Sequence, residues 1–167
     1  MPTLPKIIER RAQPYIGMRG MVSMDGIPAM FDRAFPLLFK WMEENGIAPV
    51  GAAFCKYNLI DMEGELELEV GVPVATAQTG EGDVVAGILP AGRYATITHT
   101  GPYDQLMDVN AVLIGWAKET GVIWDAEETD KGDRFVCRLE IYETDPGEEP
   151  DPSRWITEVT IRIADRA

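Results

Sequence analysis

The chain contains an internal repeat, and this repeat constrains the fold more than any other feature of the sequence. The segment LFKWMEENGI at residues 38–47 aligns with LIGWAKETGV at residues 113–122, so that Leu, Trp, Glu and Gly recur in step. Further along, EVGVPV at residues 69–74 aligns with EVTIRI at residues 158–163. The sequence therefore predicts a single domain over residues 1–167, built from two copies at about residues 1–78 and 82–167.

Hydrophobic periodicity gives each copy the order strand, helix, strand, strand. Strands are expected at residues 16–23, 52–58 and 65–74 of the first copy, and at residues 93–99, 135–144 and 155–163 of the second. Apolar residues at helical spacing mark one helix in each copy, with Leu38 in the first stripe and Leu113 in the second. The expected fold is α+β: tandem pseudo-two-fold β-α-β-β repeats, antiparallel sheets, two long helices on one side and a central cleft.

Alternation along the strands separates the two faces of the expected sheet. The apolar rows are assigned to the helix side, including, in the second copy, Phe135, Cys137, Leu139 and Ile141. The opposite face then carries Glu69, Glu140, Tyr142 and Glu158. Two arrangements remain open at this point. These side chains line a cleft if the sheet faces of the two copies turn towards each other, and they form a solvated surface if those faces meet water.

The charge of the chain narrows the classes of partner. With 28 acidic and 15 basic residues the formal net charge is -13, which disfavours direct binding to nucleic acid or to an anionic membrane surface. The sequence has no signal-peptide pattern and no apolar run of about 18 residues, so we expect a cytoplasmic protein. Cys55 and Cys137 fall in expected strands and are interpreted as reduced core thiols.

Several motifs resemble the GyrI-like small-molecule-binding domains in the same order along the chain. They are GIAPVGAAFCKYN from residue 46, THTGPYDQL from residue 98 and LEIYETDP from residue 139, and together the resemblance covers about residues 6–164. The resemblance implies a fold used as the effector-binding domain of AraC- and MerR-type multidrug regulators. Such domains hold hydrophobic, often cationic compounds between aromatic walls and a central glutamate. No room remains for a helix-turn-helix, so a stand-alone domain is expected.

The resemblance also implies which residues form the site. The central glutamate matches Glu140, while Glu158 and Glu69 match other recurrent acids of the family. The expected ligand-binding residues are therefore Glu140, Tyr142, Glu158, Trp155, Glu69, Phe54 and Tyr103. A buried carboxylate among aromatic rings suits a hydrophobic or cationic ligand. Its pKa should be raised by burial, which would also suit a general base.

Two alternatives to simple binding stay open. Some stand-alone relatives are implied to hydrolyse strained electrophiles such as cyclopropane-bearing DNA alkylators, and in that case Glu140 or Glu158 would be the catalytic base. The other alternative is a protein target, as for the gyrase inhibitor that gives the family its name. The oligomeric state is left open. Neither a metal nor another cofactor is expected, because the single His99 and the two cysteines show no metal-ligand spacing.

Overall fold

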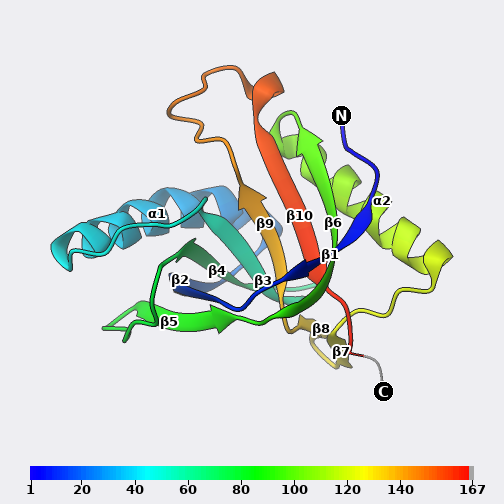
Figure 1. The fold of residues 1–167 in the computed structure, drawn as a ribbon, viewed down its shortest axis with the longest axis horizontal. Coiled ribbons are helices and arrows are strands. Elements are labelled where there is room, and N and C mark those ends of the chain that lie inside the picture. Colours follow the sequence, from blue (N-terminus) through cyan, green and yellow to red (C-terminus); the bar gives the residue numbers. More distant parts are fainter. Residues whose placement is uncertain (166–167) are drawn as a thin grey trace.

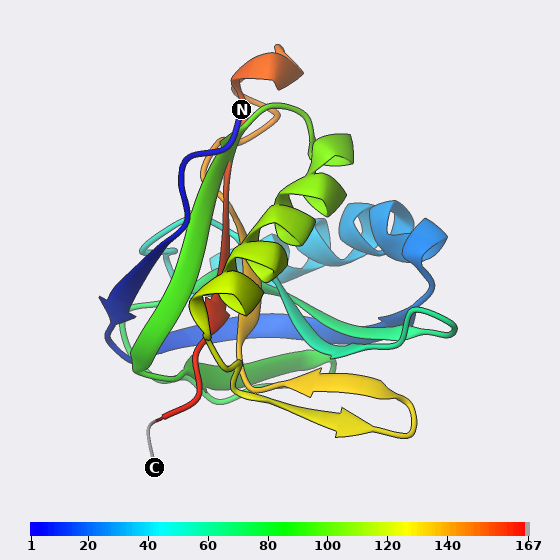
Figure 2. The same cartoon turned by 90° about the vertical axis from the view of Figure 1, so that its right-hand side faces the viewer.

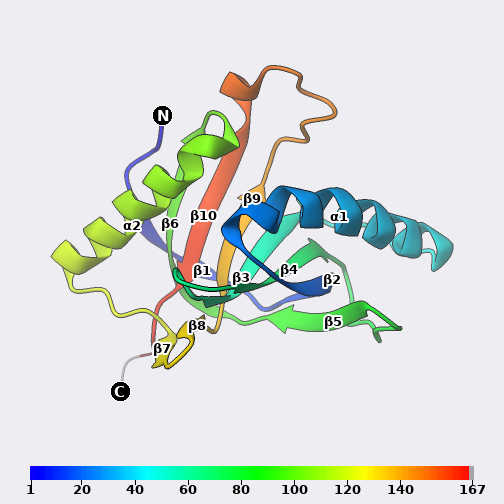
Figure 3. The ribbon, with the colours of Figure 1, turned by 180° about the vertical axis from the view of Figure 1, so that it is seen from behind.

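The computed structural model describes residues 1–165, in which ten strands form a curled antiparallel sheet. Two helices, α1 (Ile27–Glu44) and α2 (Leu106–Thr120), cover the same face of this sheet. Figure 1 shows the sheet from the side that carries no helices. Figure 3 shows it from behind, with both helices in front of the sheet and with β3 and β9 passing between them. Within residues 1–165, no helix is long and apolar enough to cross a membrane.

Six strands correspond to the six predicted from the repeat. The first copy supplies β2 (Gln13–Val22), β3 (Phe54–Ile60) and β4 (Leu66–Pro73). The second copy supplies β6 (Gly92–Thr100), β9 (Arg138–Tyr142) and β10 (Ile156–Arg162). Four shorter strands were not predicted, namely β1 (Lys6–Arg10), β5 (Val84–Leu89), β7 (Ala126–Thr129) and β8 (Gly132–Phe135).

The order of the strands shows how the two copies are joined. Along the sheet it is β1-β6-β10-β9-β3-β4-β2-β5, with the β7–β8 hairpin attached to β3 through β8. The copies therefore meet where β9 pairs with β3, and in that pair Cys55 lies opposite Glu140. The two copies exchange their edge strands. Strand β1 of the first copy pairs with β6 of the second, and strand β5 of the second copy pairs with β2 of the first. The pseudo-two-fold arrangement predicted from the repeat is confirmed.

Both faces of the sheet are buried in its middle. On the helix side, α1 packs over β2 and β4 around Leu38, and α2 packs over β6 and β10 around Leu113. Figure 2 shows α2 lying along β6. On the opposite face, which we call the rear face, a third cluster contains Tyr15, Phe54, Leu89, Tyr94, Cys137 and Leu139. Both Cys55 and Cys137 are buried free thiols.

The rear cluster overturns the predicted faces of β9. Cys137 and Leu139 lie on the rear face, whereas Glu140 lies on the helix side, where its paired residues Cys55 and Val159 also point. The alternation along β9 predicts that its apolar row faces the helices, but an apolar row marks a buried face of either kind. Phe135 does pack on the helix side, since β8 ends at that residue before β9 begins.

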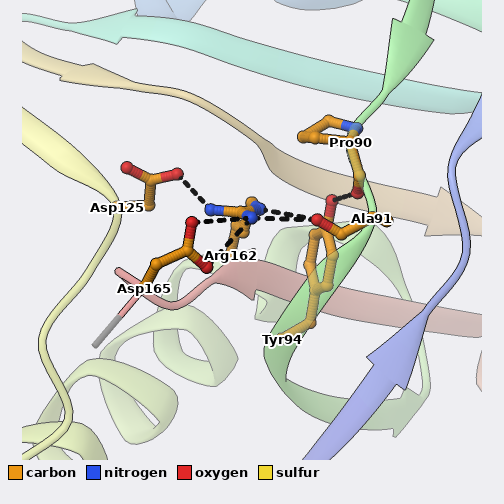
Figure 4. Close-up of polar contacts among 6 residues, drawn as sticks. All are labelled: Pro90, Ala91, Tyr94, Asp125, Arg162 and Asp165. Carbon is orange, nitrogen blue, oxygen red and sulfur yellow. Dashed lines mark hydrogen bonds and ion pairs between the residues drawn. The ribbon is translucent and has the colours of Figure 1, made fainter. Parts of the chain in front are cut away.

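A polar cluster fixes the linker between β5 and β6, as Figure 4 shows. The Tyr94 hydroxyl donates to the Pro90 carbonyl at 2.6 Å. The Arg162 guanidinium donates to the Ala91 carbonyl at 2.9 Å and pairs with Asp125 at 2.6 Å. Hydrogen bonds from a charged donor to a carbonyl contribute about 1.5–3 kcal/mol. The exchanged strand β5 is thereby tied to the second copy.

Candidate functional site

Glu140 lies at the meeting point of the two copies, on the helix side of the sheet. Its side chain is buried, with the residue only 8% exposed. The hydroxyls of Tyr57 and Tyr142 donate to its Oε1 at 2.9 and 3.0 Å. The Asn110 amide of α2 donates to Oε2 at 3.3 Å. The carboxylate is thus held by side chains from β3, β9 and α2, which come from both copies.

The repeat itself explains why two tyrosines converge on one carboxylate. FCKY at residues 54–57 and LEIY at residues 139–142 occupy equivalent places in the two copies. Cys55 and Glu140 face each other across β3 and β9, so they lie beside the pseudo-two-fold axis. Tyr57 lies two residues after Cys55, and Tyr142 lies two residues after Glu140. Both tyrosines therefore point to the same side of the sheet as Glu140. Only one of the two equivalent central positions carries a carboxylate.

The electrostatic setting of Glu140 is dominated by its burial. Burial raises the pKa of the Glu140 carboxyl above its ordinary value, and the hydrogen bonds from Tyr57, Tyr142 and Asn110 partly oppose that rise. Arg138 is a more distant positive charge, and its guanidinium donates to the Asn110 side-chain oxygen at 3.0 Å. Burial lowers the pKa of Arg138. The carboxylate consequently has hydrogen-bond partners but no direct ion pair among the described residues.

A row of aromatic rings extends from Glu140 in both directions between the helices. Tyr142 lies with its ring centroid 5.3 Å from that of Tyr103 and 5.9 Å from that of Phe31. Trp155 continues the row at 4.6 Å from Tyr103, and its indole N–H donates to the Glu149 carbonyl at 2.8 Å. Aromatic faces attract an organic cation by dispersion and by cation–π interaction, and the buried carboxylate beside them attracts it by its negative charge.

The structure brings four of the predicted site residues together and separates the other three. Glu140, Tyr142, Tyr103 and Trp155 form the site on the helix side. Glu158 and Phe54 instead line a hollow on the rear face. Glu69 is also on the rear face, in a network of its own. The expected cleft that combined all of these acids is therefore not formed, because Glu140 points away from Glu69 and Glu158.

Glu69 is the most buried of the three acids, at 1% exposure. It accepts hydrogen bonds from the Tyr15 hydroxyl at 2.7 Å and from the Asn58 amide at 2.6 Å. Lys56 and Arg19 pair with the same carboxylate at 3.8 and 3.6 Å. Its hydrogen-bonding capacity is used within the protein, which is typical of a structural role.

Four residues of the site are not among those predicted from the sequence: Tyr57, Asn110, Arg138 and Phe31. Two signals for them exist in the sequence. Aligning FCKY with LEIY makes Tyr57 the counterpart of Tyr142, and Asn110 is a polar residue beside the apolar stripe of Leu106, Val109 and Leu113. Phe31 recurs at helical spacing with Leu38, and its ring packs against the core under α1 as well as against Tyr142.

The described part of the chain contains no group of three His, Cys, Asp or Glu side chains that could hold a metal ion. His99 is buried, and its Nε2 lies 2.9 Å from the side-chain oxygen of Gln105, the residue directly before α2. Burial is the main cause of its lowered pKa. This arrangement is consistent with a structural hydrogen-bonding residue.

Residues 4–164 match the family described as the GyrI-like small molecule binding domain. No curated protein sequence matches the chain. Among solved structures, the EcmrR C-terminal domain is similar with a TM-score of 0.78 and 18% identity, over 98% of both chains. In the EcmrR–DNA complex the TM-score is 0.79 at 19% identity, and the similarity covers 98% of this chain but 58% of EcmrR.

Two further structures share the fold at lower similarity. SAV2435, solved bound to tetraphenylphosphonium, has a TM-score of 0.64 and 10% identity over 97% of this chain and 94% of its own. A hydrolase from Listeria innocua has a TM-score of 0.60 and 13% identity over 96% of this chain and 91% of its own. At these identities the similarities establish a common fold of two helices on a curled antiparallel sheet.

Proposed function

Because this chain belongs to the GyrI-like small molecule binding domain family, we propose that it binds lipophilic organic cations at Glu140. The main support for this proposal is that the Glu140 carboxylate is buried beside the rings of Tyr57, Tyr142 and Tyr103 and has no direct ion pair among the described residues. A cation in this position supplies the missing counter-charge. The Tyr57 and Tyr142 hydroxyls fix the carboxylate, and the aromatic row offers faces to the apolar part of the ligand.

The test of this proposal is a comparison of two ions that differ in the sign of their charge. Tetraphenylphosphonium and tetraphenylborate have nearly the same shape, and the cation is the ligand of SAV2435. We expect the cation to bind and the anion to bind at least about 100-fold more weakly, because the negative borate and the negative Glu140 carboxylate repel each other. Isothermal titration calorimetry measures both. Equal affinities would show that shape and hydrophobicity alone select the ligand.

The affinity for the cation should depend on pH through Glu140. Its pKa is raised above 4.5, so a proton competes with the cation over a higher pH range than for an ordinary glutamate. We expect the affinity to be constant at high pH and to fall up to about tenfold per pH unit below the raised pKa. The same shift makes the ligand-free fold less stable as the pH rises from the ordinary towards the raised value. Calorimetry between pH 4.5 and pH 8, with a neutral aromatic ligand as control, measures the effect on binding.

A second candidate function is hydrolysis of a strained electrophile, which the raised pKa of Glu140 favours. A base of raised pKa removes a proton from water at neutral pH, and the Tyr57 and Tyr142 hydroxyls are within hydrogen-bond distance of that base. In this reaction water adds to the electrophilic ring carbon, the strained bond breaks, and the proton held by Glu140 passes to the leaving atom.

The two functions give different products. A binding protein releases the compound unchanged, whereas a hydrolase releases a ring-opened product heavier by one water. We expect incubation with a cyclopropane-bearing alkylator, followed by mass spectrometry, to distinguish them. Glu140→Gln should abolish any turnover, while Glu148→Gln, which alters an exposed acid of the loop before β10, should leave turnover unchanged.

A further inference from the structure

A hollow of about 450 Å³ lies on the rear face of the sheet, behind the strands that carry the Glu140 site. We call it the rear pocket. Leu139 and Ile141, the two neighbours of Glu140 on β9, line it and point away from the helices. Its other apolar walls include Phe54, Tyr94 and Leu89. Pockets of about 300–1,000 Å³ with mainly apolar walls and a few polar groups are typical small-molecule sites.

The walls of the rear pocket are formed where the two copies exchange their first strands. One wall is the end of β1 with Arg10 and the following residue Arg11, and another is the end of β5 with Pro90. The second wall is held by the Tyr94 hydroxyl on the Pro90 carbonyl and by Arg162 on the Ala91 carbonyl (Figure 4). Both exchanged segments are paired in the sheet, so the walls of the pocket are already in place without a ligand.

The lining of the rear pocket contains one more acidic than basic side chain. Glu158 Oε2 accepts hydrogen bonds from Arg10 and from the Thr96 hydroxyl, each at 2.6 Å. Within residues 1–165, no protein donor reaches Oε1 of this carboxylate. Three acids and two arginines line the pocket as a whole: Glu9, Glu143, Glu158, Arg10 and Arg11.

Glu143 lines the same pocket and lies within the electrostatic influence of the same arginine. Burial and the charge of Glu158 raise the pKa of Glu143, and Arg10 opposes this rise. Arg10 forms its ion pair with Glu158, and within residues 1–165 Glu143 has no ion pair. A ligand with a positive charge would relieve this imbalance.

We propose that the rear pocket is a second ligand site, which binds primary organic ammonium ions. The ammonium donates to the free oxygen of Glu158 and to Glu143, and the apolar body of the ligand packs against Phe54, Tyr94 and Leu139. This specificity differs from that of the Glu140 site. Glu140 already accepts three hydrogen bonds and is surrounded by rings, which suits a cation without N–H donors, whereas Glu158 retains a free acceptor in an open pocket.

The test uses 2-phenylethylammonium as the probe, with 2-phenylethanol and 3-phenylpropionate as neutral and anionic counterparts. NMR of methyl groups reports the position of binding, because Leu139, Ile141 and Leu89 line the rear pocket while Val109 and Val159 lie on the helix side. We expect the ammonium to shift the rear methyls and to show contacts with them, and both counterparts to bind at least about tenfold more weakly. Binding of the three probes with equal affinity would overturn the proposal, as would shifts confined to the helix-side methyls.

Two variants separate this site from the Glu140 site. Glu143→Gln changes an exposed side chain of the pocket lining and should weaken binding of the ammonium by about tenfold, because the hydrogen bond to this side chain loses the negative charge of its acceptor. Glu148→Gln, on the same loop but outside the pocket, is the matched control and should change nothing. Glu140→Gln should leave binding at the rear pocket intact even where it abolishes binding of tetraphenylphosphonium. An unchanged affinity in Glu143→Gln would refute the assigned role of the pocket acids.

Discussion

Replacing Glu140 by Gln is expected to weaken the binding of tetraphenylphosphonium by about 30-fold or more, with the fold intact. Loss of one partner from a desolvated charge pair costs about 2–5 kcal/mol of binding free energy. The amide has almost the shape of the carboxylate, and its oxygen can still accept from Tyr57 and Tyr142. The change therefore removes the charge while it keeps most of the packing. Isothermal titration calorimetry gives the two dissociation constants.

The Gln variant should have nearly the stability of the parent protein without ligand, because it removes a buried charge but places an amide nitrogen opposite the Asn110 amide, which donates to Oε2 in the parent. Burial raises the pKa of Glu140, which means that the fold penalises its ionised form. Removing that charge removes the penalty. Glu148→Gln is a suitable control, since this residue is exposed. If Glu140→Gln bound the cation as tightly as the parent, the counter-charge for the ligand would have to come from another residue.

Replacing Glu69 by Ala is expected to lower the free energy of unfolding by about 3–5 kcal/mol without affecting the cation site. The variant leaves the Tyr15 hydroxyl and the Asn58 amide without their acceptor. It also removes the carboxylate that balances the charge of Lys56. Lys56 is only 12% exposed, so its charge cannot be fully hydrated where it lies. Urea unfolding followed by circular dichroism measures the loss.

Glu67 provides the matched control for Glu69, because it lies two residues earlier on the same strand and the same face. It pairs with Arg134 at 3.5 Å, and that arginine is 49% exposed. A surface pair of this kind contributes at most about 1 kcal/mol, so Glu67→Ala should have a small effect. Retained stability of Glu69→Ala, combined with loss of ligand binding, would instead make Glu69 a ligand-contacting residue.

The internal repeat made the order of the main elements predictable. Leu38 and Leu113 mark the buried stripes of the two helices, and both are fully buried in the structure. The exchanged strands β1 and β5 were not predicted, because neither has a counterpart in the strand-helix-strand-strand unit and each pairs with a segment far away in the sequence. Long-range pairing of a short strand leaves little trace in local periodicity.

The same exchanged strands explain why the faces of β9 were assigned wrongly. They help to bury the rear face around Leu139 and Tyr94, so that apolar side chains are favoured on both sides of the central strands. Glu140 lies under the helices with Tyr142. Glu158 pairs with Ile141, the residue after Glu140, so the register of β9 and β10 places Glu158 and Glu140 on opposite faces of the sheet. Alternation establishes which residues share a face, but it does not identify what covers that face.

The candidate site could be predicted in part. Glu140 and Tyr142 were identified from the LEIY motif, while Tyr57 was not, although the equivalent FCKY motif places it symmetrically. Arg138 and Asn110 form a hydrogen-bonded link between β9 and α2 that depends on how the helix is seated on the sheet. No local pattern in the sequence specifies that contact.

A crystal structure of the protein with tetraphenylphosphonium would show directly whether the cation binds at Glu140. We expect the phosphonium to lie on the helix side, between α1 and α2, with Glu140 as the nearest carboxylate and with phenyl groups against Tyr142 and Tyr103. The aromatic row beside Trp155 should rearrange to admit the ligand, since Glu140 is only 8% exposed without it. A cation bound instead on the rear face at Glu158, with the Glu140 site unchanged, would contradict the proposed function.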